Sequence, residues 1–128
     1  MSDALKNIIA AVCALFGYLF GAFDGMITAL ITLIVLDYIT GIIAAVAEKK
    51  LSSEVGARGI AKKVIMLLVV AVANVADRDI IGEGYVLRSV TAMFYIANEG
   101  ISLLENGARL GVPMPKKLID VLAQLKKE

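Results

Sequence analysis

The polar side chains that could do chemistry in this sequence lie inside apolar segments. Asp37 stands in the middle of the apolar run 30–47, and Glu99 lies in a later segment. Two such carboxyl groups could serve as a general acid and a general base. However, the sequence has no histidine and one cysteine, Cys13, which disfavours zinc chemistry, a serine triad and a histidine proton relay. Since no pattern shapes a substrate pocket around the carboxyls, we predict a protein that is not an enzyme and holds no metal.

The composition indicates that a membrane, rather than water, is the solvent of this chain. Of its 128 residues, 59% are hydrophobic, and the mean hydropathy is +0.83. One soluble domain of this length cannot bury so much apolar surface. The formal net charge of +1 gives no reason to expect a nucleic-acid partner. We therefore predict an all-α, integral membrane helical bundle that forms a single domain over residues 1–128.

Four apolar segments are expected to form the helices, at about residues 8–23, 26–47, 60–76 and 85–110. The second is the best membrane span by its length. The first would reach only about 24 Å as a helix, whereas the hydrocarbon core is about 30 Å thick. The bundle therefore has four transmembrane helices or, alternatively, three. A signal peptide is a further interpretation of the first segment, but the apolar pattern resumes directly after it.

The positive charges set the expected orientation. The link 48–63 is rich in lysine and arginine, whereas the link 77–84 carries Arg78 against three acidic residues. Because positive links stay cytoplasmic, we expect the link 48–63 and the lysine-rich C-terminus on the cytoplasmic side of the membrane. The N-terminus is also cytoplasmic with four spans, and outside with three. The lysines of the link 48–63 also offer contacts for anionic lipid headgroups of the bilayer.

The segment 85–110 has a polar stripe. Its polar residues recur at steps of three or four and therefore share one helix face. They are Arg88, Thr91, Tyr95, Asn98, Glu99, Ser102, Glu105, Asn106 and Arg109. Inside a membrane, this face must turn toward protein or water. A helix that lies flat on the membrane surface is the alternative, but surface helices usually carry lysines, and this stripe has none.

In a four-span bundle, Asp37 and Glu99 fall at a similar depth, about 16–21 Å from the outer surface. A carboxylate that faces lipid there costs about 2.5–3.5 kcal/mol, so a shared wet or hydrogen-bonded interior is expected. The candidate pore-lining or gating residues are Asp37, Arg88, Asn98, Glu99 and Ser102. The alternative is a structural clamp from Asp37 to Thr40, Tyr95 or Asn98, without a role in transport.

Arg88 lies near the expected outer end of its helix. Three acidic residues precede it in the link 77–84, namely Asp77, Asp79 and Glu83. We expect the Arg88 guanidinium to pair with one of these carboxylates and so to anchor a closed state of the bundle.

Glycines at regular spacing predict close helix packing. Small residues four apart share a helix face and allow a second helix to approach. The packing candidates are Gly17, Gly21, Gly25 and Gly41. The alternative is a flexible helix whose glycines reflect composition alone. Two further glycines, Gly56 and Gly59, are expected to allow a turn and to start the third helix.

The end of the chain predicts a short amphipathic helix. Gly111 is a plausible C-cap for the segment 85–110, and Pro113 and Pro115 prevent its continuation. The residues 115–127 then place apolar side chains on one face among lysines, which predicts an interfacial helix on the cytoplasmic membrane surface. The alternative is a frayed, solvated tail.

Three motifs in order carry a resemblance to a known family. They are "LDYITG" at 36–41, "LSSEVGARGIAKK" at 51–63 and "FYIANEGISLLENGARLGVPMPKKL" at 94–118. From about residue 26 to its end, the chain resembles the toxin-secretion/phage-lysis holin family. The matching positions are Asp37, Thr40, Gly41, Ser52, Ser53, Gly56, Gly59, Lys62, Asn98, Glu99, Ser102, Asn106, Gly111, Pro113 and Pro115.

This resemblance implies a function. Holins of this family accumulate in the bacterial cytoplasmic membrane, oligomerise and open timed lesions that release an endolysin or a toxin, without a catalytic site or cofactor. The implied partners are further copies of the chain, the lipid bilayer and, in some systems, an antiholin. The endolysin is a functional partner without expected direct contact. A holin antagonist, another regulatory membrane subunit and a small ion channel remain the alternatives.

Overall fold

The computed structural model describes residues 2–21 and 23–127, and all regular structure in these two ranges is helical. The predicted all-α class is therefore confirmed. In chain order the elements are α1 (Asp3–Phe20), α2 (Gly25–Ala47), α3 (Ser53–Val75), the π-helical turn η1 (Ala76–Ile81), α4 (Val86–Arg109) and α5 (Lys116–Lys127).

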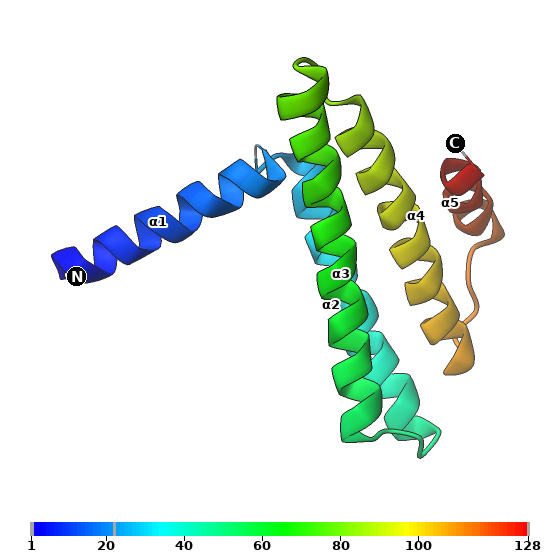
Figure 1. Ribbon diagram of the computed structural model, residues 1–128. Coiled ribbons are helices and arrows are strands. Elements are labelled where there is room, and N and C mark those ends of the chain that lie inside the picture. The colour runs from blue at the N-terminus through cyan, green and yellow to red at the C-terminus, as the bar shows by residue number, and fades with distance from the viewer. Residues whose placement is uncertain (1, 22, 128) are drawn as a thin grey trace.

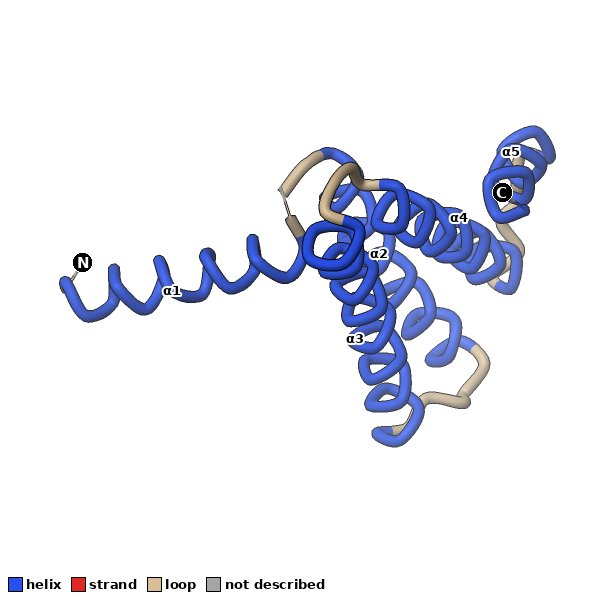
Figure 2. The backbone as a smooth tube through the Cα atoms, turned by 45° about the horizontal axis from the view of Figure 1, so that its top comes forward, coloured by secondary structure: helices blue, strands red, loops and turns tan. Residues whose placement is uncertain are grey.

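Helices α2, α3 and α4 run side by side as a three-helix bundle, with α4 packed against both α2 and α3 (Figure 1). The first helix, α1, projects away from this bundle, and the last, α5, folds back along α4. Figure 2 shows the same arrangement from another side, with α1 and α5 on opposite sides of the bundle. The bundle is therefore the part of the fold that can enclose polar residues.

Side-chain caps explain where α2 and α3 begin. The Asp24 carboxylate accepts a hydrogen bond from the Ile27 N–H at 3.1 Å, and the Ser52 hydroxyl accepts one from the Val55 N–H at 3.1 Å. Each satisfies a backbone donor that the first helical turn leaves free. The third helix consequently starts at Ser53 and not at the expected residue 60. Most of the basic link is thus helical.

The expected glycine face of the first helix is wrong. Helix α1 ends at Phe20, and Gly21 follows with a φ of 78°, while Gly25 is the first residue of α2. Within the described residues, a Cβ atom at Gly17 or Gly25 would meet no heavy atom within 4 Å. Gly17, Gly21 and Gly25 therefore do not share one helix face, although Gly21 does allow a close approach, because a Cβ atom there would lie 3.0 Å from Asn74 Oδ1. Gly41 does lie against α4, since a Cβ atom there would be 3.6 Å from Asn106 Nδ2.

Three helical stretches are long and apolar enough to cross a membrane: α1, α2 and the continuous stretch Ser53–Ile81 formed by α3 and η1. The expected fourth span is not established on this measure, because the polar face of α4 lowers its hydropathy. The outside of the molecule is apolar, as Ile8 and Val12 of α1 and Val72 of α3 are 60–68% exposed. Such a surface suits lipid. Apolar side chains also pack between the helices, where Ile27, Leu30 and Val70 are fully buried.

Candidate functional site

A buried ionic cluster joins the three helices of the bundle. Lys63 Nζ of α3 donates hydrogen bonds to Asp37 Oδ2 of α2 at 2.7 Å and to Glu99 Oε2 of α4 at 2.9 Å. The two carboxylate side chains are 8% and 3% exposed, and that of Lys63 is 16% exposed. The structure thus brings together Asp37 and Glu99, the two carboxylates that the depth comparison placed at one level.

Sequence reasoning missed Lys63, which it treated as a charge of a cytoplasmic link. The reason is the helix boundary: with α3 starting at Ser53, Lys63 lies well inside the helix. Its neighbour Lys62 is exposed. The usable signal was the presence of two buried carboxylates, which require a cation or a proton for charge compensation.

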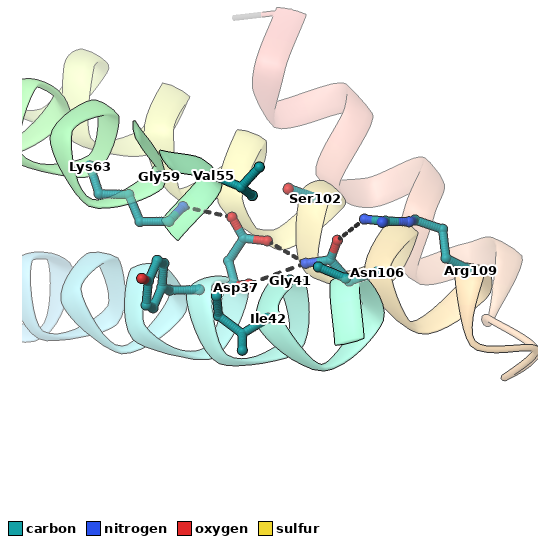
Figure 3. A pocket seen from close by; sticks show the side chains of 11 residues that line it. Asp37, Gly41, Ile42, Val55, Gly59, Lys63, Ser102, Asn106 and Arg109 are labelled. Carbon is teal, nitrogen blue, oxygen red and sulfur yellow. Dashed lines mark hydrogen bonds and ion pairs between the residues drawn. The ribbon is translucent and has the colours of Figure 1, made fainter. Parts of the chain in front are cut away.

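An amide completes the cluster on the side away from Lys63. Asn106 Nδ2 of α4 donates to Asp37 Oδ1 at 2.8 Å, to the Asp37 carbonyl oxygen at 3.2 Å and to Thr40 Oγ1 at 3.0 Å. Figure 3 shows Lys63 and Asn106 reaching the Asp37 carboxylate from opposite sides. Of the expected clamp partners, Thr40 does bind Asp37, since its Oγ1 donates to the Asp37 carbonyl oxygen at 3.1 Å. The Asp37 carboxylate itself is held by Lys63 and Asn106 and not by Tyr95 or Asn98.

An open pocket of about 260 Å³ lies beside the cluster. Its wall includes Asp37, Gly41, Lys63, Ser102, Asn106 and Arg109. Arg109 Nη1 donates to Asn106 Oδ1 at 3.3 Å, and the Arg109 guanidinium forms an ion pair with Glu48. Of the remaining candidates, Asn98 is half-buried on α4. The site thus offers charged and polar groups to water or to a small cation, but it contains no arrangement typical of a nucleophile.

A second polar cluster lies at the other end of the bundle, around Arg88. Its Nη1 and Nη2 atoms donate to the two carboxylate oxygens of Asp24 at 3.0 and 3.1 Å, and its Nε donates to the Phe20 carbonyl at 2.7 Å. The Arg88 side chain is 3% exposed. The guanidinium therefore links the start of α4 to the junction between α1 and α2.

The expected pairing of Arg88 with Asp77, Asp79 or Glu83 is thus wrong for its side chain. Asp77 instead accepts hydrogen bonds from the backbone N–H groups of Leu87 at 3.1 Å and Arg88 at 2.8 Å. A carboxylate at this place satisfies free N–H groups at the start of α4 and suits the positive end of the helix dipole. Asp77 is consequently a cap, which leaves the guanidinium to Asp24.

Two further donors hold the end of α1. Asn74 Nδ2 donates to the carbonyls of Tyr18 at 3.3 Å and Leu19 at 3.0 Å. The Arg78 guanidinium also donates to the Tyr18 carbonyl, and it lies 4.1 Å from the centre of the Tyr18 ring. The last carbonyls of a helix lack partners within the helix and attract cations. These contacts therefore fix the direction in which α1 leaves the bundle.

The Arg88 guanidinium lowers the pKa of Asp24, chiefly through their hydrogen bonds, and the Ile27 N–H adds to this effect. Asp24 precedes α2, outside the helical stretches that can cross a membrane. Its carboxylate is therefore held in the charged form that the ion pair requires.

The family-motif glycines of α3 have a packing role. The Tyr38 hydroxyl donates to the Gly56 carbonyl at 3.1 Å, and a Cβ atom at Gly59 would lie 3.3 Å from Tyr38 Cε2. Both glycines lie within α3 and make room for the tyrosine ring, so the expected turn is wrong. Five further motif residues lie at or between helix ends: Ser52 caps α3, Ser53 begins it, Gly111 follows α4 with a φ of 88°, and Pro113 and Pro115 precede α5.

Comparison with known proteins gives a consistent result. The bacteriophage holin family matches residues 14–127. An uncharacterized 14.9 kDa protein of Clostridium perfringens is 46% identical over 94% of this chain and 92% of its own length. An uncharacterized protein of Listeria monocytogenes is 42% identical over 95% of this chain and 86% of its own. A probable holin of Bacillus phage phi105 is 41% identical over 82% of this chain and 76% of its own. No solved structure matches the chain.

Proposed function

Because this chain belongs to the bacteriophage holin family, a class of membrane proteins without enzymatic activity, we propose that it forms timed lesions in the bacterial cytoplasmic membrane. In this proposal, copies of the chain accumulate, associate and open a path through which an endolysin or a toxin leaves the cytoplasm. The observation that carries the proposal is the buried cluster of Asp37, Lys63, Glu99 and Asn106, which places polar groups inside a bundle with an apolar surface.

The cluster supports a membrane span formed by the polar helix α4. Helix α4 contacts α2, or the residues next to the ends of α2, at three levels. These contacts are Arg88 with Asp24, Glu99 with Asp37 through Lys63, and Arg109 with Glu48. These contacts support a span formed by α4, since they place it along the whole length of α2. A charged group at the bilayer centre costs about 2.5–3.5 kcal/mol if it faces lipid. Burial against α2 and α3 removes that exposure.

The orientation in this proposal keeps the link between α2 and α3 and the C-terminus in the cytoplasm. The direction of α1, away from the bundle (Figure 1), supports three spans formed by α2, α3 and α4. Helix α1 then lies in the outer interface of the membrane, with its exposed apolar side chains in lipid and the N-terminus outside.

The cluster also supplies a mechanism for opening. In a single copy, the polar side chains satisfy one another between α2, α3 and α4. When copies associate, separation of α4 from α2 and α3 exposes the same groups to water, while the apolar surfaces stay in lipid. The closed state carries an excess negative charge, because two carboxylates there share one ammonium group. Repulsion between the carboxylates therefore favours opening.

Induced expression in a bacterium tests the proposed function. Culture density and membrane potential are followed together, with and without a co-expressed cytoplasmic endolysin, and the protein in the membrane is quantified. An abrupt loss of potential, with density falling only when the endolysin is present, is the expected result. Continued growth with an intact potential, despite protein in the membrane, would contradict the holin role and favour a regulatory subunit. A slow ion leak would favour a channel.

A further inference from the structure

The C-terminal helix α5 and the segment that leads into it pack against two glycines of α4, although the sequence predicts that this helix rests on the membrane surface. A Cβ atom at Gly100 would lie 3.1 Å from Leu122 Cδ1, and one at Gly107 would collide with Met114 Cε. The missing side chains at these two positions therefore allow α5 to approach α4 this closely. We call the surface around Gly100 and Gly107 the glycine face of α4.

The glycine face is separate from the face that carries the ionic cluster. The neighbouring residues Glu99 and Asn106 contact α2 and α3, whereas Gly100 lies against Leu122 of α5 and Gly107 lies against Met114, in the segment that leads into α5. Figure 2 shows α5 on the far side of α4 from α3. Because Met114 meets Gly107 and Leu122 meets Gly100, α5 runs back along α4 toward the middle of the bundle.

Lysines oppose this docked position in a membrane. Gly100 lies about 13 Å before the end of α4 at Arg109, so docking carries the later residue Lys126 close to the middle of a hydrocarbon core about 30 Å thick. Lys126 is exposed, as are Lys116 and Lys117 at the start of α5. Charged side chains at that depth are strongly disfavoured. The apolar contacts that hold α5 are therefore opposed by the burial depth of its charge.

We propose that α5 is a displaceable cover over the glycine face, and that this face receives α4 of a second copy when α5 leaves. The inference rests on the proposed function for the assembly step. A face of small residues allows two membrane helices to approach closely, and α4 carries no lysine that would oppose such packing. The displaced α5, with leucines on one side and lysines on the other, is suited to the cytoplasmic membrane surface.

A cysteine pair tests this proposal in vesicles of phosphatidylethanolamine and phosphatidylglycerol. In a Cys13→Ser background, Gly100→Cys is combined with Leu122→Cys, and the intramolecular disulfide formed on oxidation is measured at increasing protein-to-lipid ratio. The matched control combines Gly100→Cys with Val121→Cys, because Val121 is 51% exposed. We expect a high disulfide yield for the test pair at low protein density, a several-fold lower yield at high density, and little disulfide for the control.

The variant with Gly100→Cys alone should form disulfide-linked dimers over the same range of density. A test pair that gives no disulfide at low density, that matches its control, or that keeps its yield at high density would overturn the proposal. Dye release from the same vesicles reports lesion formation separately. A falling disulfide yield without dye release would support the displacement of α5 and contradict the holin role. Dye release with a constant disulfide yield would support the holin role and contradict the displacement of α5.

Discussion

Removal of the Lys63 ammonium group should destabilise the bundle strongly. In Lys63→Met, Asp37 and Glu99 lose a cation that lies 2.7 and 2.9 Å from their oxygens, and both carboxylates remain in a site that is less than a tenth exposed. Breaking a buried ion pair by removing one partner typically costs about 3–5 kcal/mol. The ratio of folded to unfolded protein should therefore fall by more than about a hundredfold.

The measurement is reversible unfolding in detergent micelles, with Lys62→Met as the matched control. Lys62 has the same charge and the adjacent place on α3, but its side chain is exposed, so its loss should change the free energy of unfolding by less than about 0.5 kcal/mol. Adding Asp37→Asn and Glu99→Gln to Lys63→Met removes the buried charges and should restore most of the stability. Equal effects of Lys63→Met and Lys62→Met would refute the assignment of the ionic cluster.

Three further predictions concern other parts of the structure. Gly59→Leu should lower the free energy of unfolding by about 1–3 kcal/mol, because the new side chain meets a tyrosine ring of α2; unchanged thermal unfolding would contradict this packing. Arg88 lowers the pKa of Asp24, so their ion pair stabilises the fold above about pH 4, and this stabilisation is lost as the pH falls through the lowered pKa. In Asp24→Asn, the free energy of unfolding should therefore depend less on pH in the acid range. An acid dependence equal to that of the wild type would count against the pair. In a Cys13→Ser background, Ser2→Cys should react in whole cells with a thiol reagent that does not cross the membrane; protection from the reagent would instead indicate four spans.

The sequence predicts which polar side chains of α4 turn inward, but it does not predict which residues they bind. The stripe on α4 and the shared depth of Asp37 and Glu99 follow from helical periodicity and rise alone, and both survive in the structure. Lys63 was hidden because the start of its helix depends on a single cap, Ser52. The expected helix 60–76 holds Lys63 in its first turn, next to the link, whereas the helix that starts at Ser53 places Lys63 nearly three turns inside.

Contacts between distant segments were not predictable in the same way. Arg88 and Asp24 are 64 positions apart, and the nearer acidic residue Asp77 was the obvious candidate until its capping role became visible. The packing of α5 on the glycine face likewise depends on how the chain returns after Pro115. Amphipathicity indicates that α5 has an apolar side, but it does not say whether lipid or protein covers that side.

The time at which the membrane potential collapses is the sharpest test of whether the buried cluster controls lesion opening. Wild type, Asp37→Asn and Glu99→Gln are compared at equal amounts in the membrane, with the endolysin present. Each substitution leaves one carboxylate for Lys63 and so removes the excess negative charge from the closed bundle. We predict a later collapse in both variants. A collapse at the wild-type time in both would contradict a gating role for the cluster.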